Sequence, residues 1–242
     1  MRDPRLAAVD RRLEGVKRIL AVTGGKGGIG KSLVSSVLAL VLAEKGHRAG
    51  LLDLDLTGPT DHVILGLDEG FPTEKFGLEP PVLAGIRFMS VSYFVGANPV
   101  PLRGADVTNA LIEILAVTRW GELDALVIDM PPGLGDAMLD AVRLIRRAEY
   151  LVVATRSRVV LETVRRTLRF LVELRAPVVG VLENMSPGDS RAVRELAGSF
   201  GLPFLGALPR DETVEGAIGD LSRLARTPLV AALRGQRDVL FP

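Results

Sequence analysis

The chain has 242 residues, and 48% of them are hydrophobic. Its formal net charge is +1, and it contains no cysteine. The lack of cysteine excludes disulfides, thiol catalysis and cysteine-held metal sites in this chain, and the balanced charge gives no reason to expect nucleic acid or a membrane as a partner. Because no apolar run approaches the ~18 residues of a membrane span, and residues 1–5 lack the apolar core of a signal peptide, we expect a cytoplasmic protein.

The first elements are predicted to be a charged arm, a strand, a loop and a helix. Residues 1–16 are charged and predict a surface helix or arm. Residues 19–22 are apolar and predict a short buried strand, whereas residues 33–42 predict a helix that is apolar on most sides. The loop between this strand and this helix has the sequence GGKGGIGKS at 24–32. The functional interpretation of the chain depends on this loop.

Residues 25–32 fit the phosphate-binding pattern G-x-x-x-x-G-K-[ST], in the strand–loop–helix setting that the pattern needs. Glycines let successive backbone N–H groups turn inward around an anion, and the N-terminus of the following helix favours negative charge. Lys31 would contact the β- and γ-phosphates of a nucleotide, and the Ser32 hydroxyl would bind Mg²⁺. The loop therefore predicts a nucleotide site.

Two other interpretations of the loop compete with this one. Gly25, Gly27 and Gly30 also spell G-x-G-x-x-G, and Asp53 follows at roughly the distance expected of a ribose-binding acid in a dinucleotide fold. The second alternative is a glycine-rich turn without a ligand. Neither alternative explains why a lysine and a hydroxyl residue close the loop, so we favour the phosphate-binding interpretation.

The next predicted strand, at residues 48–52, ends at two acidic residues, Asp53 and Asp55. Open α/β sheets bind ligands at the carboxyl ends of their strands, so two carboxylates beside the loop are candidate functional groups. The alternative is that these acids only cap the turn that follows the strand.

A second acidic strand end follows later in the chain. The elements predicted before it are an exposed excursion at 66–81, a strand at 86–91, a loop at 92–104 and a helix around 107–118. Residues 125–128 are then an apolar run that ends at Asp129 and is followed by Gly133. This pattern matches the second element of nucleotide sites, in which a strand-end Asp holds Mg²⁺ and a glycine can place its N–H on the γ-phosphate.

The last third of the chain continues the alternation of strands and helices. We predict strands at 150–155, 178–183 and 204–208, and helices at 159–174, 190–199 and 220–233. His47 and His62 are interpreted as surface residues in turns. The alternation predicts an α/β fold in which one domain, residues 1–242, contains a doubly wound, mostly parallel sheet of about seven or eight strands with helices on both faces.

The loop with Lys26 before its glycine pair resembles the deviant Walker A motif of the MinD/ParA/nitrogenase-iron-protein group. Within that group the chain looks most like the Mrp/ApbC family, from about residue 16 to the C-terminus. The matching pieces are LLDLDLTGP at 51–59, RG at 103–104, WGELD at 120–124, VIDMPPG at 127–133 and ENMS at 183–186. The last two pieces favour Mrp over MinD.

The resemblance implies a role for each matching position. Lys26 would reach the partner's nucleotide across a face-to-face homodimer, and Asp55 would orient the attacking water. Asp53 would lie in the outer shell of the metal, and Asp129 and Gly133 would form a second switch.

The resemblance also implies the base contacts and the cofactors, ATP and Mg²⁺. Asn184 would contact the adenine edge, and the loop at Pro209 and Arg210 would pack against the base. The candidate residues are Lys26, Lys31 and Asp55 for catalysis; Gly25, Gly27, Gly28, Ile29, Gly30, Lys31, Ser32, Leu33, Gly133, Asn184, Pro209 and Arg210 for nucleotide binding; and Ser32, Asp53 and Asp129 for the metal.

The chain departs from the family pattern at three places. Leu33 stands where a second hydroxyl residue usually lies near the α-phosphate, and Leu134 replaces the usual Thr after Pro-Pro-Gly. Family members that carry an iron–sulfur cluster typically place Cys-x-x-Cys in the loop after Asn-Met-Ser, and the dimer shares the cluster there. Here that loop is cut to residues 187–189 and has no cysteine, so thiolate bridging of a cluster is impossible.

We therefore expect an Mg²⁺-dependent ATP-binding protein with slow ATP hydrolysis coupled to closure of a homodimer. One hypothesis is an Mrp-type metallocluster maturation factor that works with a cysteine-bearing partner. The alternatives are a ParA/MinD-like positioning switch and a nucleotide-binding adaptor without turnover. The presence of Lys26, Asp55 and Asp129 argues against the adaptor.

Overall fold

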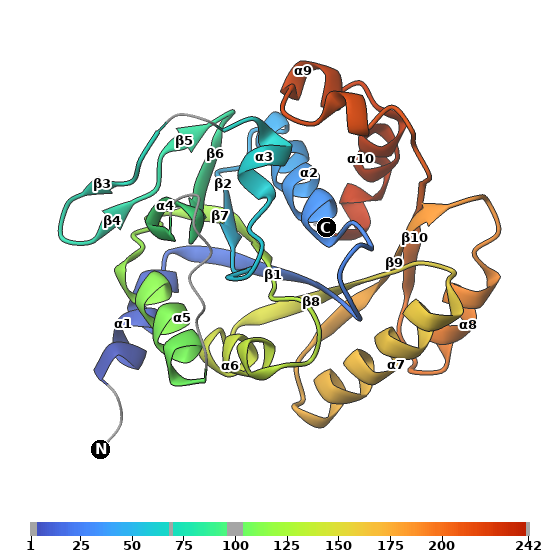
Figure 1. The fold of residues 1–242 in the computed structure, drawn as a ribbon, viewed down its shortest axis with the longest axis horizontal. Coiled ribbons are helices and arrows are strands. Elements are labelled where there is room, and N and C mark those ends of the chain that lie inside the picture. The colour runs from blue at the N-terminus through green and yellow to red at the C-terminus, as the bar shows by residue number, and fades with distance from the viewer. Residues whose placement is uncertain (1–3, 68–69, 96–103, 241–242) are drawn as a thin grey trace.

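The computed structural model describes residues 4–67, 70–95 and 104–240. This part of the chain contains a sheet of eight strands and a separate two-stranded hairpin (Figure 1). The strands of the sheet are β1 (Val16–Gly24), β2 (Ala49–Asp53), β5 (Val82–Leu83), β6 (Ile86–Ser90), β7 (Leu123–Asp129), β8 (Ala148–Ala154), β9 (Val178–Ser186) and β10 (Phe204–Pro209). The hairpin consists of β3 (Thr73–Glu74) and β4 (Leu78–Glu79) and lies within the predicted excursion.

The sheet is doubly wound about β1. The strand order is β10-β9-β8-β1-β7-β2-β6-β5, so β1 lies between β7 and β8. Every pairing in this sheet is parallel except that of β5 with β6. The predicted α/β fold with a mostly parallel sheet is therefore confirmed, and the carboxyl ends of β1, β2 and β7 meet at the same edge.

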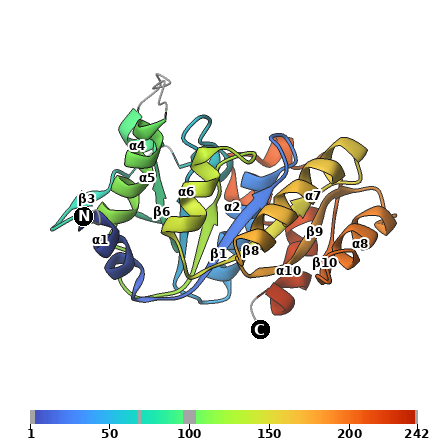
Figure 2. The ribbon, with the colours of Figure 1, turned by 90° about the horizontal axis from the view of Figure 1, so that it is seen from below.

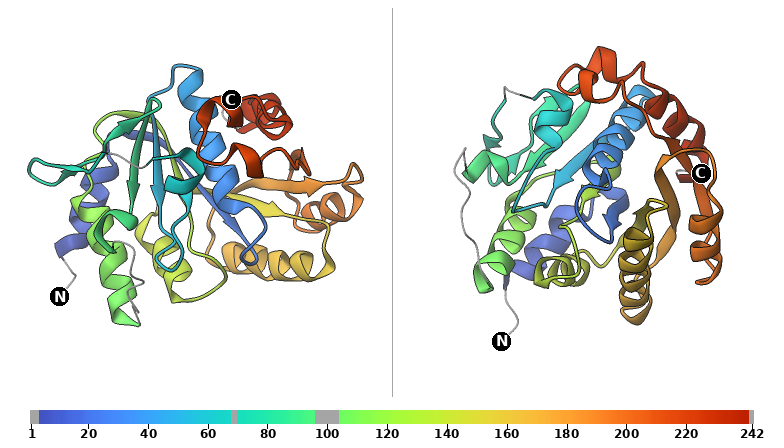
Figure 3. Two further views of the ribbon diagram at one scale, coloured as in Figure 1. Left: turned by 45° about the horizontal axis from the view of Figure 1, so that its top comes forward. Right: turned by 45° about the vertical axis from the view of Figure 1, so that its right-hand side comes forward.

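Helices cover both faces of the sheet. They are α1 (Pro4–Leu13), α2 (Lys31–Glu44), α3 (Asp61–Leu65), α4 (Ser92–Val95), α5 (Ala105–Val117), α6 (Asp136–Leu144), α7 (Arg158–Glu173), α8 (Arg191–Gly198), α9 (Leu221–Leu224) and α10 (Pro228–Leu240), with a 3-10 turn at Glu215–Ala217. Helices α2 and α10 lie on one face, and α6 and α7 lie on the other, in front of the strands in Figure 2. The two oblique views in Figure 3 show the same layering.

The core follows from the apolar strands. Strands β1, β2, β7 and β8 are buried along most of their length because helices cover the sheet on both sides. Helix α2 is buried over most of its length, as its nearly all-round apolar sequence predicts. Helix α1, in the predicted N-terminal arm, packs against α5 and buries Val9 and Leu13. Within the described residues, no helix combines the length and the apolar character needed to cross a membrane.

Four expectations about local structure are corrected. The predicted helix at 220–233 is two helices, α9 and α10, because Pro228 begins a new helix instead of continuing the first. Strand β9 continues to Ser186, so Asn184 lies inside the strand and not after it. His62 is half-buried within α3, and not on a surface turn. The predicted loop at 92–104 begins with α4, while Arg103 lies outside the described residues.

Candidate functional site

The glycine-rich loop joins β1 to α2 at the carboxyl edge of the sheet. Gly28 and Gly30 have φ angles of 79° and 78°, in the left-handed region that favours glycine. The space around Gly30 is also closed, because a Cβ atom there would lie 2.2 Å from Nδ2 of Asn184. Gly25 is buried against α7, where a Cβ atom would lie 2.5 Å from the backbone nitrogen of Val164. The conformation and packing of the loop therefore depend on these glycines.

Three side chains from the first turns of α2 converge on Asp129 at the end of β7. Nζ of Lys31 lies 2.7 Å from Oδ2 of Asp129, and the Ser32 hydroxyl donates to the same oxygen at 2.7 Å. The Ser35 hydroxyl donates to Oδ1 of Asp129, also at 2.7 Å. The Lys31 side chain is 8% exposed and Asp129 is fully buried, so the ion pair is shielded from solvent. The fold thus joins two predicted motifs whose contacting residues are 98 positions apart.

Asp129 belongs to a cluster of three buried carboxylates with Asp53 and Asp61. One oxygen of each lies within 4.8 Å of those of the other two. Burial, and then the charge of Asp129, raises the pKa of Asp53 to about 7. The same two causes, in the same order, raise the pKa of Asp61 well above its usual range. The oxygen ligands and the concentrated negative charge suit a hard cation such as Mg²⁺.

Asp61, Ser35 and Ser36 are residues of this site that sequence reasoning missed. Asp61 begins α3, which has only five residues and gives no clear helical periodicity. The Ser36 hydroxyl donates to Oδ1 of Asp61 at 2.8 Å, and Oδ2 of Asp61 is buried without a hydrogen-bond partner among the described residues. The two serines interrupt an otherwise apolar helix, and this interruption is the signal that could have identified them.

Asp55 lies at the edge of the cluster, but one of its oxygens is engaged in a turn. Oδ1 of Asp55 accepts hydrogen bonds from the backbone nitrogen of Thr57 at 3.1 Å, the Thr57 hydroxyl at 2.8 Å and the backbone nitrogen of Gly58 at 3.0 Å. This geometry matches the turn-capping alternative for Asp55. Its second oxygen, Oδ2, accepts no hydrogen bond within the described part of the chain. A water molecule could use that oxygen without disrupting the turn.

A cavity of about 370 Å³ opens beside the first turn of α2. It is lined by Leu33, Asn184, Pro209 and Arg210, together with residues that follow β10. Nδ2 of Asn184 donates to the carbonyl of Ile29 at 2.9 Å, while its Oδ1 is buried with no donor among the described residues. A buried amide oxygen without a donor can accept a hydrogen bond from the amino group of a nucleobase. The fold thus brings the predicted base contacts to one cavity.

Among the remaining predicted positions, Lys26, Gly27 and Gly28 lie on the exposed rim of the loop, Gly133 is half-buried, and the side chain of Ile29 is buried in the core. Lys26 is exposed and has no hydrogen bond or ion pair with another described residue. A Cβ atom on Gly27 or on Gly28 would meet no atom within 4 Å. Gly133 has a φ of 75°, and the neighbouring Leu134 is 41% exposed. Within a single chain, Lys31 forms an ion pair with Asp129 of the carboxylate cluster, whereas Lys26 forms none with a described residue.

A family model described as ParA, NUBPL iron-transfer P-loop NTPase, matches residues 15–225. The chain belongs to this family. The resemblance to Mrp-type P-loop NTPases is thereby confirmed, and ATPase activity is typical of the family. The matched residues include the glycine-rich loop and all three clustered carboxylates. They also include every residue that lines the cavity beside Asn184 except Leu229.

Relatives of this NTPase include proteins named iron-sulfur cluster carrier protein. The one from Aquifex aeolicus is 36% identical over 220 residues, which cover 84% of this chain and 60% of the relative. The one from Pseudomonas fragi is 38% identical over 213 residues, with 81% of this chain and 74% of the relative covered. The chain therefore spans about three fifths of the length of the Aquifex relative.

Solved structures with a similar fold contain bound nucleotide. A nucleotide-binding protein from Archaeoglobus fulgidus in complex with ADP superposes with a TM-score of 0.74 at 28% identity, covering 91% of this chain and 93% of that one. The septum site-determining protein MinD from Pyrococcus horikoshii, complexed with Mg-ADP, superposes with a TM-score of 0.68, covering 93% and 96% of the two chains. Its identity of 20% means that this second likeness supports the fold alone.

Proposed function

We propose that this NTPase binds ATP with Mg²⁺ and hydrolyses it slowly, in a cycle coupled to closure of a homodimer. The observation that carries the proposal is the convergence of Lys31 and Ser32 on one oxygen of Asp129, each at 2.7 Å. A lysine and a hydroxyl at the N-terminus of a helix are the groups that hold phosphate and Mg²⁺ in phosphate-binding loops. In this arrangement, Asp129 holds Lys31 at the mouth of the loop until a phosphate replaces it.

The residues present fit Mg²⁺, because they offer a hydroxyl and three clustered carboxylates as oxygen ligands. Ser32 and Asp129 would hold the ion, with Asp53 in its outer shell. When bound, Mg²⁺ neutralises charge on the phosphates. A bound cation would also reduce the repulsion between the three carboxylates of the cluster. The buried carboxylate of Asp61 would in this way contribute negative charge that favours binding of the cation.

The remaining residues would position the substrate. Backbone N–H groups of the glycine-rich loop would surround the phosphates, and Lys31 would move its charge from Asp129 to them. Oδ2 of Asp55 would orient the attacking water, while Oδ1 keeps the turn in place. Asn184 would accept a hydrogen bond from the adenine amino group, with Pro209 and Arg210 against the base.

Closure of a homodimer would bring a second lysine, Lys26 of the other copy, to the phosphates. Lys26 is exposed and unpaired among the described residues, on the open side of the loop where Gly27 and Gly28 have free space around them. From a second copy of the chain, the same lysine would approach the phosphates as charge develops on them. Turnover would then depend on the dimer, and each chain alone would bind nucleotide without hydrolysing it efficiently.

The biological role that we propose is nucleotide-controlled delivery of iron–sulfur clusters together with a cysteine-bearing partner. Relatives named as iron-sulfur cluster carriers support this role. The partner is needed because this chain has no cysteine, and the loop after β9 that would carry the ligands is only residues 187–189. The NTPase would thus contribute the nucleotide-dependent change of shape, and the partner would contribute the thiolates.

The experiment that tests this activity measures the molecular mass of the protein in solution and its rate of ATP hydrolysis. Purified protein is analysed by size exclusion with light scattering, with and without Mg²⁺ and a slowly hydrolysed ATP analogue, and phosphate release from ATP is measured in parallel. We expect nucleotide-dependent dimerisation and slow phosphate release. A constant mass with no phosphate release would contradict the proposal and favour a nucleotide-binding adaptor.

A separate experiment tests the role in cluster delivery. After anaerobic reconstitution with iron and sulfide, this chain alone is expected to retain no cluster absorbance through gel filtration. A stable cluster on the chain alone would show that ligands other than cysteine suffice and would remove the need for a partner.

A further inference from the structure

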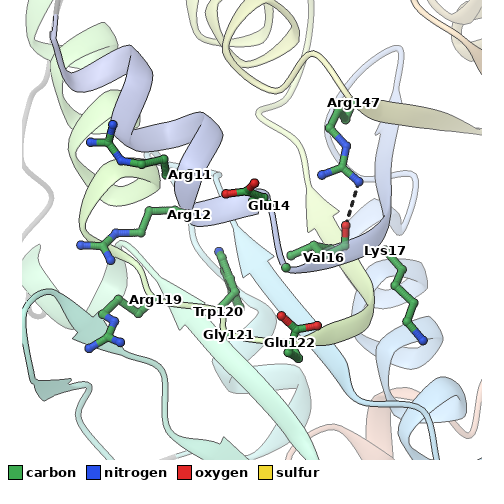
Figure 4. Close-up of a pocket in the computed structure, with 11 residues that line it drawn as sticks. Arg11, Arg12, Glu14, Val16, Lys17, Arg119, Trp120, Gly121, Glu122 and Arg147 are labelled. Atoms are coloured by element: carbon green, nitrogen blue, oxygen red, sulfur yellow. Dashed lines mark hydrogen bonds between the residues drawn. The ribbon is translucent and has the colours of Figure 1, made fainter.

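A cavity of about 500 Å³ lies at the end of the sheet opposite to the glycine-rich loop (Figure 4). It is formed where α1 turns into β1 and where residues 119–122 lead into β7. Five cationic side chains and two carboxylates line it, which leaves a formal surplus of three positive charges. The cations are Arg11, Arg12, Lys17, Arg119 and Arg147.

Backbone carbonyls hold two of these guanidinium groups in place. Arg147 donates to the carbonyls of Leu13 and Val16, at 3.1 and 2.9 Å. Arg12 donates to two carbonyls, both at 2.9 Å. Neutral carbonyls fix the orientation of a guanidinium group without cancelling its charge, so both groups keep their positive charge at the cavity wall.

The other three cations differ in how far they are neutralised. Lys17 lies 2.9 Å from a carboxylate oxygen of Asp124, and Arg119 lies 3.6 Å from one of Glu79. The guanidinium group of Arg11 is exposed and has no hydrogen bond or ion pair with any described residue. Figure 4 shows the side chains of Arg11, Arg12 and Arg119 extending to the same side, one above another. Like charges gathered in this way repel one another, and a bound anion would relieve the repulsion.

The cavity wall also contains a buried hydrogen-bond donor without a partner. Trp120 is fully buried, and its Nε1 has no acceptor among the described residues. In Figure 4 the nitrogen of the indole ring points toward the space between Arg12 and Glu14. A buried N–H without an acceptor is uncommon in folded proteins and calls for an explanation. An acceptor oxygen supplied by a ligand in the cavity would provide one.

We propose that this cavity binds a small, multiply charged oxyanion, with phosphate or carboxylate groups. A guanidinium group can donate two parallel hydrogen bonds to the oxygens of a phosphate or of a carboxylate. The indole N–H of Trp120 would donate a further hydrogen bond to the same ligand. The volume is within the range of small-molecule sites. The two lining carboxylates, Glu14 and Glu122, are both exposed and have no ion pair within the described residues, so they are free to turn toward solvent.

The single tryptophan of the chain makes the proposal directly testable. The emission of Trp120 is followed while pyrophosphate or citrate is added at constant ionic strength, with the nucleotide site saturated by Mg-ADP. A saturable change in emission is expected. A response to pyrophosphate alone identifies a phosphate ligand, and a response to citrate alone identifies a polycarboxylate. No saturable response to either probe, or the same response to sodium chloride, would overturn the proposal.

A pair of arginine variants tests where the anion binds. Arg11→Gln removes an exposed charge that has no hydrogen bond or ion pair with any described residue, and it is expected to weaken binding of the active probe at least about tenfold. Arg169→Gln removes an exposed arginine on α7, outside the cavity, and is expected to leave the affinity unchanged. Equal affinities for the two variants and the parent would contradict the proposed site. Calorimetry on Trp120→Phe, which lacks the indole N–H, is expected to show a weaker affinity as well.

Discussion

The side-chain amide of Asn184 fills the space that any side chain on Gly30 would need. A Cβ atom on Gly30 would lie 2.2 Å from Nδ2 of Asn184, which itself donates to the carbonyl of Ile29 at 2.9 Å. The end of β9 is therefore fixed against the glycine-rich loop. The cavity that we assign to the base and the loop that we assign to the phosphates are thus coupled through one amide group.

This relationship predicts different effects for two substitutions with the same backbone strain. Gly28→Ala and Gly30→Ala both place a side chain at a φ near +80°, which costs roughly 1 kcal/mol of unfolding free energy. Only at Gly30 does the new Cβ collide with another residue, so Gly30→Ala is expected to lose at least about 1 kcal/mol more. Chemical denaturation of both variants without nucleotide measures the difference. Equal losses would mean that Asn184 moves away at no cost.

The two lysines of the loop are expected to differ in both stability and activity. Lys31→Ala should abolish nucleotide binding and also lower the unfolding free energy by about 3 kcal/mol, because Asp129 is left buried without its cation. Lys26→Ala removes an exposed charge and should keep both stability and nucleotide affinity while losing dimer-dependent turnover. Denaturation, nucleotide titration and phosphate release measure these effects. A Lys26→Ala variant that hydrolyses ATP like the parent would refute the cross-dimer role.

Removing one acid from the carboxylate cluster is expected to stabilise the protein without Mg²⁺ or nucleotide. Burial and the charge of Asp129 raise the pKa of Asp61, so the folded state binds a proton more tightly there than the unfolded state. The parent should therefore lose stability as the pH rises above the ordinary carboxyl pKa of about 4. Asp61→Asn removes this loss, and its Tm at neutral pH should rise by about 2–4 °C for each 1 kcal/mol gained.

The control for that experiment is Asp10→Asn, which removes an exposed carboxylate on α1. It should leave both the Tm and its pH dependence as in the parent. With Mg²⁺ and nucleotide added, the Tm of the parent should exceed that of Asp61→Asn, because the negative charge of Asp61 would then stabilise the bound cation. A lower Tm for Asp61→Asn in the absence of Mg²⁺ would show that the three acids are not in conflict.

The opposite dependence on pH is expected at Asp124, on the other end of β7. Hydrogen bonds from Arg48, and then from Lys17, lower the pKa of Asp124, so the folded state favours its charged form. Its contribution to stability is therefore present at neutral pH and is lost as the pH falls below the ordinary carboxyl pKa. Asp124→Asn should have a lower Tm than the parent at pH 7, and the difference should shrink toward pH 3.

The neighbouring Glu122→Gln serves as the matched control, because Glu122 is exposed, has no ion pair with another described residue, and raises the pKa of Arg48 less than Asp124 does. Its Tm should follow that of the parent over the same pH range. A difference between Asp124→Asn and the parent that stays constant with pH would assign the loss to packing and not to charge.

The sequence alone determined the parts of this protein that rest on local signals. Apolar runs and their period predicted the alternating strands and helices, and the glycines with Lys31 and Ser32 predicted the loop between β1 and α2. The position of Asp129 after an apolar strand predicted that it would lie at the same edge of the sheet. The lack of cysteine also excluded, from composition alone, any thiolate ligand for a metal or cluster in this chain.

Which side chains meet depends on the packing of elements that are far apart in the sequence. The packing of the whole sheet places β7 directly beside β1, and this neighbourhood sets the contact of Lys31 with Asp129 across 98 positions. Asp61 joins the cluster because the five-residue α3 packs against α2, an arrangement that no sequence period encodes. Trp120 and Arg147 face one cavity for the same reason. Spacing along a chain fixes the element that carries a residue, whereas contacts between elements depend on how their faces are buried together.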